Sequence, residues 1–431
     1  MGVMILKAAL SFFLSMLIIL GLYIFAISDG DDGDAVLSLT SARKKDVSFA
    51  PRTPLNYDKP KAMWLSQFDM KDIYTYRGKQ RESAEYTRLA ERVISNLSSM
   101  GINTVFIQLR PNGDSIYPSE IYPPSQYAVG AYGAEFEYDP FEIFLSLAHE
   151  ANISVHAWIN PLRCMSVDNI EKIPEKYKIK RWYLEGKYVK EVDGYLYLDP
   201  AQNEVRELIA NGAREIIDTY DVDGVHIDDY FYPTSDEGFD RGSYLALNDK
   251  RLSLADFRRE QTNKLVRDLY DTVKSRSTSL LFGVSPSGNT SRNYNELFVD
   301  VEAWCDGGYV DYICPQIYFG FEHETHPFDA VLGEFSKMSG ARGVSLIVGI
   351  TLEKADNGYR GLEDTWAGVG ASEWITQKNI IKRSLLCVRE LDDTYGVALF
   401  SYRLLFDPVT DEPRIETREE YENFMPVLLE M

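Results

Sequence analysis

The sequence predicts a (β/α)8 barrel, and three observations favour that fold class. Short apolar runs alternate with longer amphipathic stretches eight times after Lys61, which is the order expected of parallel strands joined by crossover helices. The chain has 431 residues, and barrels with insertions reach this size. The runner-up is a doubly wound open sheet, but none of the apolar runs is followed by the G-x-G-x-x-G motif that often marks that fold.

The predicted strands are short and rich in aliphatic and aromatic residues, as parallel strands covered on both faces are. In chain order they are Ala62–Phe68, Thr104–Arg110, Ser154–Asn160, Gly224–Tyr230, Leu280–Pro286, Val310–Tyr318, Ser345–Leu352 and Gly396–Tyr402. The stretches between them repeat apolar residues every three to four positions, which is typical of helices that cover a core. The predicted helices are Ser83–Met100, Pro140–Ala151, Gln202–Tyr220, Ser253–Ser275, Asn295–Asp306, Thr325–Ser339, Ser372–Leu391 and Thr417–Leu429.

Residues 1–28 at the N-terminus are predicted to contain a membrane segment. The run Ala8–Ile27 has no charge and no proline, and about 20 such residues cross a bilayer. A secretory signal usually has a shorter apolar region of about 7–15 residues, so an uncleaved signal anchor is favoured over a cleaved signal peptide. Lys7 precedes the run and acidic residues follow it, which places the rest of the chain outside the cytoplasm.

Two further segments complete the predicted organisation. Residues 29–60 are polar and rich in Asp, Gly and Pro, which is typical of a flexible linker. The barrel is therefore expected over residues 61–431. The protein would be attached to the cell membrane, or secreted if the first segment is cleaved.

Composition argues against several classes of partner and cofactor. The 45 basic and 66 acidic residues give a formal charge of −21, so a nucleic-acid partner is not expected. The four cysteines include no C-x-x-C pair, and the five histidines form no H-E-x-x-H motif. A zinc-dependent hydrolase is therefore disfavoured, and no metal or cofactor is predicted.

The segment 223–233, which reads DGVHIDDYFYP, is the strongest functional signal. Strand alternation places His226, Asp228 and Tyr230 on one face, and catalytic residues of barrel enzymes lie at the carboxyl ends of strands. Two adjacent acids at the end of a buried strand are costly to desolvate without a function. We therefore predict Asp228 and Asp229 as catalytic residues. The structural alternative is that one of them caps a helix or pairs with an arginine.

Other predicted strands also end in polar and aromatic side chains. Taken singly, each fits a structural hydrogen bond. Together they supply amide and guanidinium donors over an aromatic floor, which is what sugar hydroxyls require. The predicted substrate-binding residues are Arg110, Trp158, Asn160, Arg163, His226, Tyr230, Gln316 and Tyr318, with Asp114 as a second choice.

Six motifs carry a resemblance to a known family. QLRPNGDSIYPSEIYP, HAWINPLR, LDPA, DGVHIDDYFYP, FGVSPSG and PQIYFG occur in this order between about Lys61 and Pro408. They resemble the glycosyl-hydrolase-like 10 family of bacterial envelope proteins. The resemblance implies a (β/α)8 barrel, a glycan substrate with peptidoglycan glycan strands favoured, and Asp228 as the nucleophile. The chain departs from the family at Leu352-Glu353-Lys354, where the family has Leu-Tyr-Lys, and at Pro111-Asn112-Gly113.

Glycoside hydrolysis usually takes two carboxyl groups, one protonated and one ionised. We predict Asp228 as the ionised partner. The proton donor stays open among Asp229, Glu322, Glu324 and Glu353. Chitinase-like, substrate-assisted chemistry is disfavoured because Tyr230 stands where the motif D-G-x-D-x-D-x-E places its catalytic acid. The other alternative is a catalytically inactive, glycan-binding scaffold of the envelope.

Overall fold

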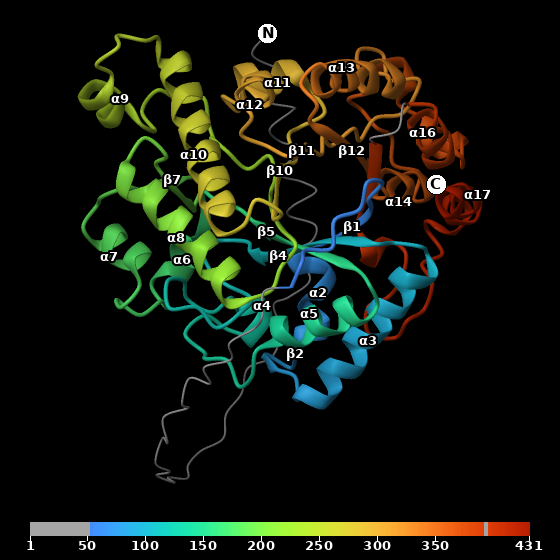
Figure 1. Cartoon of the computed structure of the whole chain (residues 1–431), viewed down its shortest axis with the longest axis horizontal. Helices are drawn as coiled ribbons and strands as arrows, with labels where there is room; N and C mark the ends of the chain where they lie inside the picture. The colour runs from blue at the N-terminus through green and yellow to red at the C-terminus, as the bar shows by residue number, and fades with distance from the viewer. Residues whose placement is uncertain (1–51, 392–394) are drawn as a thin grey trace. The chain divides into compact units, whose positions relative to one another are not determined.

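Eight parallel strands close into a barrel in the computed structural model of the protein (Figure 1), which describes residues 52–391 and 395–431. Each strand pairs with its neighbour in chain order, and pairing between the first and last closes the ring. The strands are β1 (Lys61–Leu65), β4 (Thr104–Arg110), β5 (Ser154–Ile159), β9 (Gly224–Ile227), β10 (Leu281–Val284), β11 (Tyr312–Ile313), β12 (Ser345–Thr351) and β13 (Tyr395–Phe400). The predicted (β/α)8 barrel is confirmed.

A helix follows each strand and packs against the outside of the barrel (Figure 1). The buried positions of α8 recur every three to four residues and include Val205, Leu208 and Ile209, as the predicted amphipathic pattern requires. The outer helices are α3 (Ser83–Ser99), α5 (Pro140–Glu150), α8 (Asn203–Thr219), α10 (Leu254–Arg276), α12 (Val301–Gly307), α13 (Phe328–Gly340), α16 (Ile380–Arg389) and α17 (Arg418–Glu430).

Two predicted helices are interrupted. The stretch 372–391 forms α15 (Glu373–Thr376) and α16, because Gln377 between them is extended, with φ −113° and ψ 140°. The stretch 295–306 is divided between α11 (Thr290–Asn295) and α12, because Phe298 has a φ of 55°. A left-handed residue cannot continue a right-handed helix.

Aromatic rings fill the interior of the barrel and lie against glycines on other strands. A Cβ atom on Gly283 would lie 2.0 Å from the ring of Tyr312, so this pair allows no side chain at residue 283. A Cβ atom on Gly224 would likewise lie 2.8 Å from the ring of His156, and one on Gly349 would lie 2.9 Å from the ring of Trp64. The interior is therefore packed by rings to a density that leaves no room for additional atoms.

Four interior side chains form a continuous chain of hydrogen bonds. Trp64 Nε1 donates to His226 Nε2 at 3.2 Å, so His226 carries its proton on Nδ1. That N–H donates to the Tyr312 hydroxyl at 3.0 Å, and the hydroxyl in turn donates to His156 Nδ1 at 2.9 Å. Burial lowers the pKa of His156 to about 4 and that of His226 well below its ordinary value. Both histidines are therefore neutral at neutral pH.

The chain contacts the barrel before the predicted boundary at Lys61. Asp223, which precedes β9, accepts hydrogen bonds from Arg52 Nη2 at 2.7 Å and from the amide of Leu55 at 2.6 Å. Tyr57 donates to the carbonyl oxygen of Asn152 at 2.5 Å. The end of the predicted linker 29–60 thus packs at the amino ends of the strands.

No helix within residues 52–391 and 395–431 is long and apolar enough to span a membrane. The predicted membrane segment 8–27 lies outside the described residues.

Candidate active site

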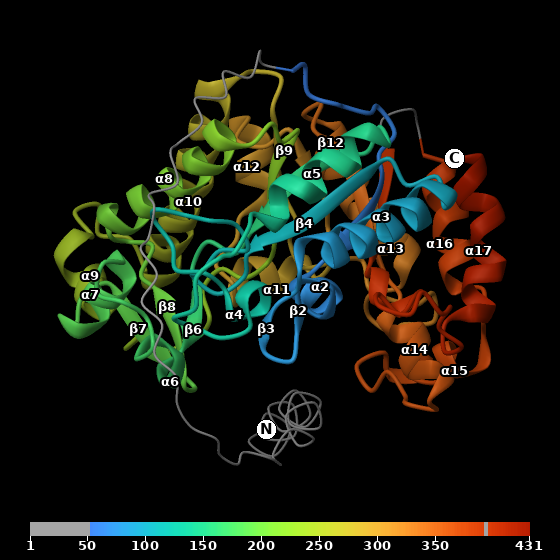
Figure 2. The ribbon, with the colours of Figure 1, turned by 90° about the horizontal axis from the view of Figure 1, so that it is seen from below.

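Insertions follow several strands at the carboxyl end of the barrel. After β5 the chain forms a small antiparallel sheet of β6 (Arg163–Ser166), β8 (Tyr195–Leu198) and β7 (Val189–Val192). After β12 it forms α14 (Glu353–Tyr359) and α15. Both insertions lie along the lower side of the view in Figure 2. This is the end at which barrel enzymes place their chemistry.

Asp228 follows the last residue of β9 and is 3% exposed. Its Oδ2 accepts hydrogen bonds from Asn160 Nδ2 at 2.6 Å and Trp158 Nε1 at 3.1 Å. Its Oδ1 accepts one, from the amide of Tyr230 at 3.2 Å. Burial, with a smaller contribution from the charge of Asp229, raises the pKa of Asp228 to about 7. This carboxyl can therefore carry a proton near neutral pH.

A relay of amide side chains fixes Asp228 from the neighbouring strands. The backbone amide of Gln67 donates to Gln108 Oε1 at 2.9 Å. Gln108 Nε2 donates to Asn160 Oδ1 at 2.6 Å, and Asn160 Nδ2 in turn donates to Asp228 Oδ2. Since the side-chain amides of Gln108 and Asn160 each have one donor and one acceptor engaged in this line, the orientation of Asn160 is determined.

Asp229 also belongs to the group, although strand alternation would turn it away. The strand β9 ends at Ile227, so the backbone after it no longer alternates. Gln316 Nε2 reaches Asp229 Oδ1 at 3.1 Å from the extension of β11. Burial raises the pKa of Asp229, while the nearby charge of Arg292 and the Gln316 hydrogen bond oppose the rise. Asp228 is thus held from β5, and Asp229 from the β11 side.

Tyr318 connects this pair to a third carboxyl. Its ring lies 6.0 Å from that of Phe400 in a stacked arrangement. Burial, followed by the charges of Asp229, Glu353 and Asp228 among others, raises the pKa of Tyr318 well above its ordinary value. Glu353 begins α14 directly after β12. Of the predicted proton donors, Asp229 and Glu353 therefore share the surroundings of Tyr318 with Asp228.

Arg163 and Tyr230 form the side of the mouth next to Asp228. The Arg163 guanidinium lies 4.8 Å from the centre of the Tyr230 ring, which is 44% exposed. The charge of Arg163 acts to lower the pKa of Asp228. Both residues were expected to contact substrate, and the structure places them beside Asp228 and Asp229.

Arg110 does not join this group, and its expected position was wrong. A bulge between Gln108 and Arg110 shifts the register so that Arg110 pairs with the outward-facing Ile159. Its guanidinium lies 4.5 Å from the Tyr122 ring and so close to α8 that a Cβ atom on Gly212 would lie 1.8 Å from its Nη1. Arg110 therefore contributes to packing between β4 and α8.

The expected substrate contact of His226 is also not found. It shares the face of Asp228, as predicted, but lies one layer deeper and is fully buried. Its ring stacks on Phe106 with centres 4.1 Å apart. Trp158 is 5% exposed, so it acts on Asp228 through its N–H and offers little ring surface to a ligand.

The second-choice residue Asp114 is buried within its own loop. It accepts the amide of Asn112 at 2.8 Å and the hydroxyl of Tyr132 at 2.8 Å. Its carboxylate therefore organises the loop after β4.

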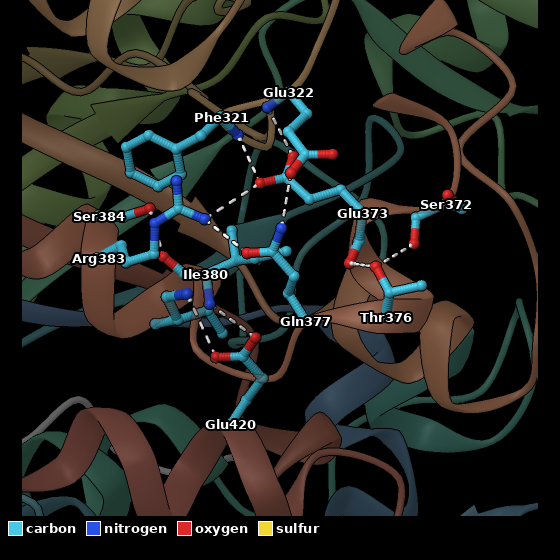
Figure 3. A network of polar contacts seen from close by, with 11 residues as sticks. Phe321, Glu322, Ser372, Glu373, Thr376, Gln377, Ile380, Arg383, Ser384 and Glu420 are labelled. Carbon is cyan, nitrogen blue, oxygen red and sulfur yellow. Dashed lines mark hydrogen bonds and ion pairs between the residues drawn. The ribbon is translucent and has the colours of Figure 1, made fainter. Parts of the chain in front are cut away.

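The remaining acidic candidates lie in the loop after β11, which is tied to α15 and α16. The carboxylate of Glu373 accepts the amides of Phe321 at 3.0 Å and Glu322 at 2.8 Å, as Figure 3 shows. The Glu322 carboxylate accepts from Gln377 Nε2 at 2.7 Å. Glu324 packs against Gly368, where a Cβ atom would lie 1.9 Å from its Oε2. Neither Glu322 nor Glu324 hydrogen-bonds to the Asp228 group in the described part of the chain.

Sequence reasoning missed one nearby cation and the support for Asp228. Arg292 of α11 faces Asp229 closely enough to oppose its raised pKa. No motif marked it, because it follows β10 by eight residues and the intervening loop sets its position. Gln67 and Gln108 lie at strand ends, but only pairing between strands shows that they act through Asn160.

A parallel eight-stranded barrel with two desolvated carboxyls after its fourth strand is the arrangement of a glycoside-hydrolase-like protein. The chain belongs to the Glycosyl hydrolase-like 10 family, whose model matches residues 59–367. The resemblance seen in the motifs is confirmed.

Two curated relatives carry the name glycosyl hydrolase. Glycosyl hydrolase YngK of Bacillus subtilis strain 168 is 30% identical over 321 residues, covering 69% of this chain and 62% of YngK. The chain thus spans less than two thirds of that relative. Glycosyl hydrolase DigH of Escherichia coli strain K12 is 28% identical over 341 residues, covering 74% of this chain and 76% of DigH.

Solved structures share the fold at low sequence identity. The PgaB (BpsB) glycoside hydrolase domain from Bordetella bronchiseptica aligns with a TM-score of 0.51 and 11% identity, over 79% of this chain and 93% of that domain. The catalytic domain of a beta-amylase from Paenibacillus polymyxa aligns with a TM-score of 0.52 and 10% identity, over 86% of this chain and 98% of that domain. These likenesses establish the barrel fold.

Proposed function

We propose that the protein hydrolyses glycosidic bonds of a bacterial envelope glycan, with peptidoglycan glycan strands as the favoured substrate. The observation that carries this proposal is the pair Asp228 and Asp229. Both carboxyls are desolvated, and each is held by donors from a different side of the barrel mouth. The family and the names of its curated relatives support a hydrolase.

The two carboxyls take different roles in this proposal. Adjacent desolvated carboxyls share a proton, because ionising both places two negative charges side by side. Asp228 Oδ2 already accepts two donors, whereas Oδ1 accepts one. A proton on Oδ1 faces no competing donor other than the Tyr230 amide. We therefore assign proton donation to Asp228 and the ionised role to Asp229, which Gln316 and Arg292 favour. This exchanges the roles expected from the sequence.

The remaining site residues orient the sugar. Tyr318 and Gln316 approach the acids from the β11 side, and Tyr230 and Arg163 from the side of the β6–β8–β7 sheet. Asn160 and Trp158 position Asp228 rather than contact the sugar. Nothing in this scheme requires a cofactor.

Turnover on defined glycans tests the proposal. The full-chain protein is incubated with intact peptidoglycan, peptide-stripped glycan strands and chitin oligomers, and the products are identified by mass spectrometry. New reducing ends from the stripped strands, absent with Asp228→Asn, are expected. Asp268→Asn serves as the matched control, because Asp268 lies on the outer helix α10 and pairs with Arg206.

Retention of glycan without cleavage by wild type and Asp228→Asn alike would contradict the proposal. That result would favour the alternative of a glycan-binding scaffold. Equal loss of activity in Asp268→Asn would show that the substitution at Asp228 acts through folding.

We also propose that residues 8–27 anchor the protein in the cell membrane, with the barrel outside the cytoplasm. The support is the length and apolarity of this run and the charges that flank it. Membrane fractionation and protease treatment of intact spheroplasts test this. Recovery of the full-length chain in the cytoplasmic fraction would contradict it.

A further inference from the structure

The Arg163 guanidinium has unused hydrogen-bonding capacity beside the catalytic pair. Its Nε is buried without a partner, and its side chain makes no hydrogen bond or ion pair to any other residue within 52–391 and 395–431. The Tyr230 ring covers one face of the guanidinium plane at 4.8 Å. A planar guanidinium stacked in this way keeps its N–H edges available to a ligand.

The neighbours of Arg163 are phenols and one carboxyl. Tyr197 lies opposite it on β8. Burial acts to lower the pKa of Arg163, but Tyr230, Tyr197 and Asp228, among others, raise it above its ordinary value. The group is thus a permanent cation in a partly buried, aromatic wall.

Charge neutralisation of Asp228 does not explain why Arg163 lies beside it. An arginine that serves to ionise a carboxyl forms a direct ion pair with it, and Arg163 forms none with Asp228 in the described structure. Burial outweighs its effect, so that the pKa of Asp228 is raised despite the cation. The terminal nitrogens Nη1 and Nη2 of Arg163 are not among the buried, unpartnered atoms and have no partner within residues 52–391 and 395–431, so they are the donors that a ligand at the mouth can use.

We propose that Arg163 is a specificity-determining residue of this site, whose guanidinium binds a carboxylate on the sugar beside the bond that is cut. A carboxylate accepts two parallel N–H bonds from a guanidinium edge. Neutral chitin and cationic, deacetylated amino-sugar polymers offer no such acceptor. This inference rests on the proposed function and names the residue that would recognise the carboxylate of its substrate.

Chemical removal of the carboxylate from the glycan tests the inference. The substrates for the full-chain protein are peptide-stripped glycan strands, which carry lactyl carboxylates, and the same strands with these groups reduced to alcohols. Hyaluronan serves as a second source of carboxylate, on uronic acid. We expect Arg163→Gln to lower kcat/KM on the native strands by roughly 10- to 100-fold, mainly through KM, as loss of a charge-assisted pair implies. On the reduced strands wild type and variant should agree within about twofold, because the lost partner is already absent. Arg163-dependent action on hyaluronan would show that a uronate also serves.

Two variants separate this role from a structural one. Arg267→Gln is the matched control, because Arg267 lies over the Tyr309 ring at 4.3 Å but belongs to the outer helix α10. Arg163→Lys keeps the charge and the stem but loses the two-pronged geometry, so an intermediate loss on native strands is expected. It replaces Arg163→Gln if thermal unfolding shows that the glutamine variant does not fold. An equal loss on native and reduced strands would overturn the inference.

Binding measurements keep this test separate from that of the proposed function. If wild type cleaves neither form of the strands, the proposed hydrolysis fails. Calorimetric binding of short strands to Asp228→Asn then decides the inference alone. Binding at least tenfold tighter for native than for reduced strands, lost in the double variant with Arg163→Gln, supports it. Equal binding of both forms, or of neither, overturns it.

Discussion

Replacing Tyr312 by Phe removes a single oxygen atom from the middle of the barrel. That oxygen accepts the Nδ1–H of His226 at 3.0 Å and donates to His156 Nδ1 at 2.9 Å. Tyr312 and both histidines are no more than 2% exposed, so water does not replace the lost partner. The phenyl ring stays in place, and no large cavity forms.

The magnitude follows from the two groups left without partners. An unsatisfied buried donor or acceptor costs about 1–3 kcal/mol, so Tyr312→Phe should lower the free energy of unfolding by about 2–6 kcal/mol. Domains of this kind are stable by only about 5–15 kcal/mol, so the loss is easily measured. Urea denaturation at neutral pH, followed by circular dichroism, is the assay.

Tyr244→Phe provides the comparison. Its hydroxyl donates to the carbonyl of Leu252 at 2.9 Å in a half-buried position, so a loss of only about 0.5–1.5 kcal/mol is expected. A loss for Tyr312→Phe that is no larger than the loss for Tyr244→Phe would refute the reasoning. It would mean that the histidines find other partners or that water enters the barrel.

Four further predictions concern the site and its floor. Asp228→Asn should lower kcat by about 10²- to 10⁴-fold, measured by release of reducing ends. Asn160→Ala removes a donor to the Asp228 carboxylate worth about 1.5–3 kcal/mol, which raises the pKa of Asp228 by about 1–2. The basic limb of the pH–rate profile should move upward by that amount, and a shift of the acidic limb instead would assign the ionised role to Asp228. Burial lowers the pKa of His156 to about 4 in the native protein. Below pH 6.5, the ordinary pKa of histidine, His156 is therefore protonated in the unfolded state but stays neutral in the native state. Stability should therefore fall by about 2 kcal/mol between pH 7 and pH 5 from this residue alone, a slope that His156→Gln should remove. Gly283→Ala should cost at least about 1–3 kcal/mol in urea denaturation, because its Cβ atom would overlap the ring of Tyr312.

The barrel could be predicted because its evidence is local and repeated. Each strand is a short apolar run and each helix an amphipathic stretch, so errors at one element do not change the fold class. The interruption at Gln377 depends on a distant residue. The carboxylate of Glu420 in α17 accepts the amides of Ile380 at 2.9 Å and Ile381 at 3.2 Å, which fixes the start of α16 there.

The site was predicted where regular alternation holds, and missed where it fails. Asp228, Trp158 and Asn160 meet because β5 and β9 are regular neighbours. The bulge before Arg110 reverses the face of that residue, and nothing in the sequence marks it. Asp229 turns to Gln316 because β9 ends early.

His226 shows a different limit. Its face was predicted correctly, but alternation gives no information on depth within a barrel. Only the pairing of neighbouring strands shows that His226 lies level with Trp158, below the layer that a ligand can reach.

The fit between glycines and rings inside the barrel also restricts how related sequences can change. A larger residue at Gly283 requires a smaller one at Tyr312, and the smaller residue alone leaves a void. Neither substitution is acceptable until the other is present. The floor beneath the two aspartates should therefore vary among homologues through compensated pairs, whereas the rim that carries Arg163 and Tyr230 is free to change one residue at a time. Such a division would let this family alter the glycans it accepts without rebuilding the support of its carboxyl pair.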